Sequence, residues 1–164
     1  MATLQSVVAQ RLRDTPALMN AEDAGGLGFN GVYTKWLVET GPGAEPDAFT
    51  VGGGKIKPAI VVWHGNVNPA TSVSVPEWTK WDHFLPVYLF HYPSDHGKDV
   101  LDRAIIALEN SLCGTWQPVI TGGQRPYIHT NPQEQHIDDE SQFPGNYVVV
   151  LRFQVTGIRP APAR

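Results

Sequence analysis

The side chains best suited to chemistry in this sequence are its six histidines, because imidazole serves as a metal ligand and as a general acid or base. Four of them lie near carboxylates, in two groups. The groups are His91, Asp95, His96 and Asp99, and His129, Glu134, His136, Asp138 and Asp139. A zinc site needs four convergent ligands, and the sequence has neither an HExxH helix nor a cysteine-rich set. A small His-dependent metal enzyme is therefore kept as an alternative, while polar strand ends and loops are the plain interpretation.

A second chemical candidate is the segment Gly52–Lys55, which resembles part of a phosphate-binding loop. The Walker pattern requires Ser or Thr after the lysine to ligate magnesium, and Ile56 stands there. The upstream glycine of the pattern would fall on Thr50 or earlier, and it is missing. We interpret the segment as a loop, and we expect no nucleotide, metal or other cofactor.

The single cysteine, Cys113, would act as a nucleophile only with a histidine beside it, and the sequence has no GxSxG elbow for a serine. Cys113 directly follows Leu112, the end of an apolar stripe, so packing is its expected role. One cysteine also excludes an intramolecular disulfide. With no catalytic set of residues found, the sequence predicts a protein that is not an enzyme.

Four tryptophans suggest a different class of function, a platform for a sugar or a peptide. They are Trp63, Trp78, Trp81 and Trp116. Tryptophan is also enriched in cores and in protein interfaces, where it anchors contacts. A carbohydrate- or peptide-binding domain is therefore a further alternative to a protein that works by assembling with others.

Two helices are predicted from apolar residues at helical spacing. The first is Thr3–Arg13, with Leu4, Val7, Val8 and Leu12 on one side, and it stops before Pro16. The second begins after a cap at Ser94 or Asp95 and runs to about Cys113, with Gly114 following it. Its predicted buried stripe is Val100, Leu101, Ala104, Ile105, Leu108 and Leu112.

The remaining apolar segments read as strands. They are Gly31–Thr40, Pro58–His64, His83–Tyr92, Trp116–Ile120, Tyr127–Thr130 and Asn146–Thr156. Pro58–His64 is almost continuously apolar, as expected of a strand covered on both faces. The simplest fold is α+β, an antiparallel or mixed β-sheet with two helices packed on one face. We expect one domain over residues 1–164, with long loops at 41–54 and 65–80, a polar segment at 131–145 and a proline-rich tail at 158–164.

The composition indicates many turns around a modest core, because Gly and Pro are numerous (16 and 14) and charged residues are few, at 17%. The net charge of −4 argues against nonspecific binding of nucleic acid through a basic face. No stretch reaches the roughly 18 apolar residues of a membrane span, and the N-terminus lacks the pattern of a signal peptide. We expect synthesis in the cytoplasm and no membrane partner.

The order of elements resembles that of phage tail terminator and tail-completion proteins. The central part is the strand Pro86–Tyr92, the link Pro93–Asp95, and the helix through Ala104–Leu108 to Leu112–Gly114. An opening helix followed by Gly31–Val32–Tyr33 precedes it, as in that family. An acidic loop and the long strand Tyr147–Thr156 follow it. The loops at 41–54 and 65–80 are longer than is usual for the family.

This resemblance implies a homo-oligomeric ring, commonly a hexamer, at the head-proximal end of the tail tube of a virion. Such a ring ends polymerisation of the tube protein and joins the tail to the head connector, while DNA passes through without specific binding. A head-completion or neck protein of the same virion is the alternative within this class.

The acidic segment 134–140 holds four carboxylates without a Lys or Arg. They are Glu134, Asp138, Asp139 and Glu140. One interpretation is a solvated hairpin loop on an outer rim. The other follows from the resemblance: an acidic loop facing the lumen, where a basic wall would hold DNA phosphates and slow its passage.

Overall fold

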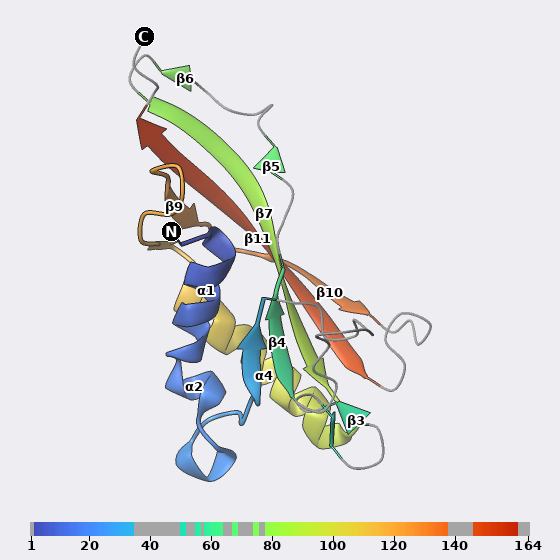
Figure 1. Cartoon of the computed structure of the whole chain (residues 1–164). Helices are drawn as coiled ribbons and strands as arrows, with labels where there is room; N and C mark the ends of the chain where they lie inside the picture. The colour runs from blue at the N-terminus through green and yellow to red at the C-terminus, as the bar shows by residue number, and fades with distance from the viewer. Residues whose placement is uncertain are drawn as a thin grey trace, which may run out of the picture.

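The computed structural model describes residues 2–34, 50–51, 55–56, 58–63, 67–68, 74–75, 78–137 and 146–160. Figure 1 shows helices gathered on one side of a long, twisted sheet. The helical elements are α1 (Leu4–Arg13), α2 (Pro16–Met19), the 3-10 turn η1 (Glu22–Ala24) and α4 (Asp95–Leu112). The strands are β1 (Gly31–Tyr33), β2 (Thr50–Val51), β3 (Lys55–Ile56), β4 (Ala59–Val62), β5 (Val67–Asn68), β6 (Ser74–Val75), β7 (Trp78–His91), β8 (Thr115–Trp116), β9 (Arg125–Ile128), β10 (Gln133–Ile137) and β11 (Tyr147–Pro160).

The two predicted helices are present, and each begins at a capping side chain. At α1, Thr3 and Ser6 form a reciprocal capping box. At α4, the Ser94 hydroxyl accepts a hydrogen bond from the Gly97 amide at 2.8 Å. As predicted, α1 ends at Arg13, before Pro16. Pro16 then starts a second short helix, α2, which was not predicted. Proline suits the first position of a helix, because the N–H group that it lacks would have no hydrogen-bond partner within the helix there.

The main sheet is mixed, which confirms the α+β prediction. Its order is β1-β4-β7-β11-β9-β8, with β10 beside β11 and both β5 and β6 beside β7. β1 and β4 are parallel, and the other pairs are antiparallel. β2, in the predicted loop 41–54, pairs separately with β3, which follows that loop. The other residues of the loop lie outside the described part, as do residues 35–40 of the first predicted strand.

The longest feature is a ribbon of β7 and β11, which pair over 14 residues from His91–Tyr147 to Trp78–Pro160. Figure 1 shows its upper half extending past the helices. Both strands are longer than predicted, because the backbone N–H and C=O groups of each strand form hydrogen bonds with those of the other. β7 thus begins inside the predicted loop 65–80, which also holds β5 and β6. β11 continues into the predicted tail as far as Pro160.

The described part of the acidic segment differs from the predicted loop. Residues Gln133–Ile137 form β10 and pair antiparallel with Arg152–Val148 of β11. Four of the five residues are exposed, so no alternation of apolar residues marks them as a strand. Glu134 therefore lies on a strand, whereas Asp138, Asp139 and Glu140 lie outside the described residues.

The main core lies between the helices and one face of the sheet. The α4 residues Leu101, Ile105, Leu108 and Leu112 belong to one buried cluster with Val149, Leu151 and Phe153 of β11, as predicted. The opposite face has a smaller cluster of Ala59, Val61, Phe90 and Val148. All four residues of β4 are buried, which confirms that this strand is covered on both faces.

Candidate functional site

The first predicted histidine group lies where β7 ends and α4 begins. The His91 side chain is 1% exposed, and its Nδ1 donates a hydrogen bond to the Tyr92 carbonyl at 2.9 Å. The His96 ring is 6.2 Å away, centre to centre, but its Nε2 pairs with Glu22 at 2.7 Å. Asp99 lies 3.8 Å from Arg103 instead. The His96–Glu22 contact joins α4 to η1. His91 and His96 thus bind different partners and do not face a common ligand position.

Burial lowers the pKa of His91 below its ordinary value of 6.5, against the opposing effect of the Tyr92 carbonyl. The positive charge of a protonated His96 lowers this pKa further, and Glu22 raises it. Because the folded chain favours neutral His91, the unfolded chain binds more protons as the pH falls below 6.5. The stability from this group is thus present above that pH and is lost as the pH falls through the folded-state pKa.

We therefore expect the free energy of unfolding to decrease as the pH falls below about 6.5, by at most ~1.4 kcal/mol per pH unit from His91 alone. Urea titrations at several pH values measure this slope. His91→Gln, which cannot titrate, should flatten it. Equal slopes for the wild type and His91→Gln would contradict the assignment.

The second histidine group is not brought together. The Nε2 atom of His129 is hydrogen-bonded to the Thr156 hydroxyl at 2.7 Å, next to β11. His136 on β10 pairs with Glu134 at 2.8 Å on the same exposed strand face. Among the residues that the structure describes, no three His, Cys, Asp or Glu side chains gather as metal ligands do.

Cys113 packs against the main core, as predicted from its place after Leu112. Burial and the nearby Glu109 raise the pKa of its thiol. A nucleophilic cysteine needs the opposite environment, one that stabilises the thiolate. The site therefore favours packing over catalysis.

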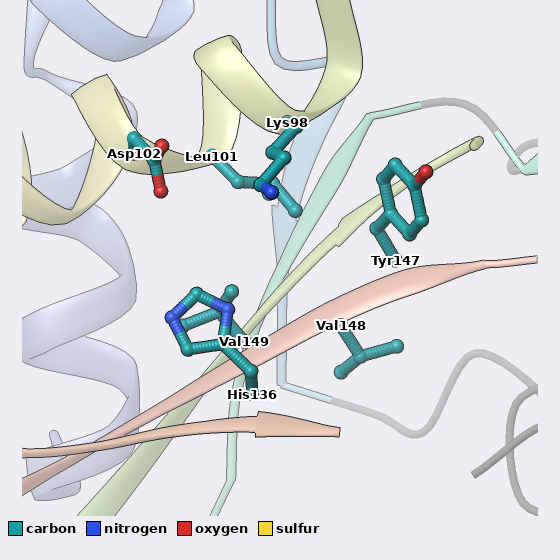
Figure 2. Close-up of a pocket in the computed structure, with 7 residues that line it drawn as sticks. All are labelled: Lys98, Leu101, Asp102, His136, Tyr147, Val148 and Val149. Carbon is teal, nitrogen blue, oxygen red and sulfur yellow. The ribbon is translucent and has the colours of Figure 1, made fainter. Parts of the chain in front are cut away.

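A small groove of about 230 Å³ lies between α4 and the strands β10 and β11. Figure 2 shows Lys98 and Leu101 reaching from α4 toward the strands, and His136 on the β10 side. Asp102, Tyr147, Val148 and Val149 complete the lining. The groove combines charged side chains, an aromatic ring and an apolar floor, which suits contact with a protein side chain.

A second surface feature is an aromatic patch on β8, β9 and the residue that follows β9, made of Trp116, Arg125, Tyr127 and His129. Trp116 is 46% exposed, and its ring lies 5.0 Å from that of Tyr127. The Tyr127 ring is 5.2 Å from that of His129, and the Arg125 guanidinium lies 5.4 Å from the Trp116 ring centre. Trp116 and His129 were predicted from the sequence in separate roles, whereas Arg125 and Tyr127 were not, although residues 125 and 127 of one strand share a face.

The other predicted aromatic residues differ from Trp116. Trp63 is half-buried and packs against the cluster on the second sheet face, so it serves the core. Trp78 and Trp81 lie on β7, but their side chains are outside the described part. Within the described ranges, no helix is both long and apolar enough to span a bilayer.

No protein-family model matches the sequence, and no curated protein is similar to it in sequence. Among solved structures, the fold is similar to that of a chain in the "Virion of native gene transfer agent (GTA) particle". The two chains superpose with a TM-score of 0.58 over 94% of each, at 16% sequence identity. At this identity the likeness shows a shared fold, and it extends over almost the whole length of both chains.

Proposed function

We propose that this chain is a structural, non-enzymatic protein of a phage-like virion, and that it acts as a tail terminator. The observation that carries the proposal is the fold shared with a virion chain across 94% of both proteins. The order β7, α4, β11 supports it, since this is the part of the sequence that resembles tail terminators. The surfaces described above fit a protein that works by contact with neighbours.

In this role, one domain spanning residues 1–164 forms a homo-oligomeric ring, of six copies in the usual case. A contact between two different surfaces of the subunit generates a closed ring when the rotation that relates neighbouring copies is a whole fraction of a full turn. One rim of the ring contacts the last layer of the tail tube protein, and the other contacts the head connector. The site of action is the head-proximal end of the tail.

Deletion of the gene from the producing genome, followed by electron microscopy of the particles, tests the proposal. Loss of a terminator should give tail tubes of uncontrolled length that are not joined to heads. Restoring the gene on a plasmid should return tails to uniform length. Loss of a head-completion or neck protein would instead leave tails of normal length beside unjoined heads, which would assign that alternative role. Normal particles would contradict both.

The acidic segment gives a separate test of how the ring is oriented. We propose that Glu134, Asp138, Asp139 and Glu140 face the lumen, where like charges from several copies stay hydrated and do not hold DNA. Replacing Asp138, Asp139 and Glu140 together by lysine should allow assembly but slow DNA ejection. The defect should ease as salt rises, because phosphate contacts weaken with salt.

Ejection rates at several salt concentrations measure this effect. The matched control replaces the same three residues by asparagine and glutamine, which removes the negative charge without adding positive charge. The control should eject at nearly the wild-type rate. Unchanged ejection by the lysine variant would mean that the segment lies on the outer rim.

A further inference from the structure

We infer that the aromatic patch of one copy docks into a groove between α2 and α4 of the next copy. This inference rests on the proposed ring and names the two surfaces that form its subunit contact. The argument depends on where the two surfaces lie, on their shapes and on their charges.

The aromatic patch lies on the sheet face that points away from the helices. Ile128 of β9 is fully buried in the cluster under the helices. Because neighbouring side chains of a strand alternate, Arg125 and Tyr127 point to the opposite face, and the His129 ring packs edge-on against Tyr127. Trp116 joins them from β8, where it is paired with Tyr127. Val119, at 60% exposure, adds a further apolar side chain in the following segment.

The groove lies in the helical layer instead. It measures about 540 Å³ and has an apolar floor from Pro16, Ala17, Ile106 and Ala107. Ile106 is 60% exposed although α4 has a buried stripe for its other large apolar residues. A hollow of this size can receive an indole ring, and tryptophan, tyrosine and arginine are the residues that most often anchor protein contacts.

The charges of the two surfaces are complementary. Asp14 lies at the groove and accepts a hydrogen bond from the neutral Gln10 amide at 3.1 Å. The other charged residue of the groove, Arg103, already faces Asp99. The charged residue of the aromatic patch is Arg125. Docking therefore brings the Arg125 guanidinium toward the Asp14 carboxylate of the next copy.

The occupant is a second copy because this chain carries both complementary surfaces. They lie in opposite layers of the fold, so each copy contacts one neighbour through the patch and another through the groove. Contacts of this head-to-tail kind generate rings or filaments.

Photocrosslinking of the full chain tests this docking. A benzoyl-phenylalanine replaces Trp116, and isotopically light and heavy copies are mixed so that links between copies are recognised by mass. We expect such links at α2 and at Ile106–Ala107 of the second copy, in concentrated solution or in purified particles. The matched control places the same group at Tyr147, which is 38% exposed and lines the other groove, and it should not link to α2.

A second experiment reverses the charge at each of the two surfaces. Arg125→Glu and Asp14→Lys should each reduce the link between copies about tenfold, because like charges then face each other. Mixing the two variants should restore the link, since every contact between them again joins opposite charges. Both variants should keep the wild-type unfolding temperature, because these residues are exposed.

The outcomes separate this inference from the proposed function. Links to another surface of the second copy, no links between copies, or no recovery in the mixture would each overturn the docking. The proposed function fails independently if deletion of the gene leaves tails of normal length joined to heads.

Discussion

Leu108→Ala should lower the free energy of unfolding by about 2–5 kcal/mol, the range for a leucine removed from a well-packed core. Leu108 is fully buried in the middle of α4, and it belongs to the cluster that joins this helix to β11. The substitution removes apolar contacts and leaves a cavity that the surrounding helix and strands fill only partly. Chemical denaturation followed by tryptophan fluorescence measures the change.

Ile106→Ala is the matched control, because it lies on the same helix two residues away and is 60% exposed. Both substitutions end in alanine, so they change helix propensity by a small and similar amount. The control should change stability by no more than about 0.5 kcal/mol when measured on the dilute chain. Equal effects of the two substitutions would mean that α4 presents a different face to the sheet.

Gly97→Ala should destabilise the protein by about 1–3 kcal/mol, the usual range for an overpacked position. A Cβ at residue 97 would overlap the His91 imidazole and would lie 2.6 Å from the Tyr92 carbonyl oxygen. To remove this overlap, the first turn of α4 must move away from the end of β7, or the buried His91 ring must change position. Helix propensity alone favours alanine by roughly 0.8–1.0 kcal/mol, so a net loss must come from this contact.

The control for Gly97→Ala is Lys98→Ala, which changes the next residue of the same turn at an exposed position. It should be close to neutral. The pH dependence gives a second readout, because displacing His91 toward water should return its pKa toward the ordinary value and flatten the slope described above. A stabilised Gly97→Ala variant would show that the close approach of α4 to His91 is absent.

The histidine groups show how limited the prediction of a site from sequence is. His91 and His96 are close in both sequence and space, yet their ring nitrogens serve Tyr92 and Glu22. The Glu22 partner is 74 residues away in the chain, so no local pattern indicates it. The aromatic patch is a similar case, since its Trp116 and Tyr127 meet only because β8 and β9 pair.

The sequence alone determined the elements that carry their own signals. The cap at Ser94 and the apolar stripe of α4 specify a helix and its buried face, because capping and helical periodicity act within a few residues. The apolar run of β4 likewise specifies a strand covered on both sides. Only the tertiary structure decided that the polar Gln133–Ile137 is a strand and that β11 continues to Pro160. These segments have no periodic apolar pattern, and their conformation comes from backbone hydrogen bonds to a neighbouring strand.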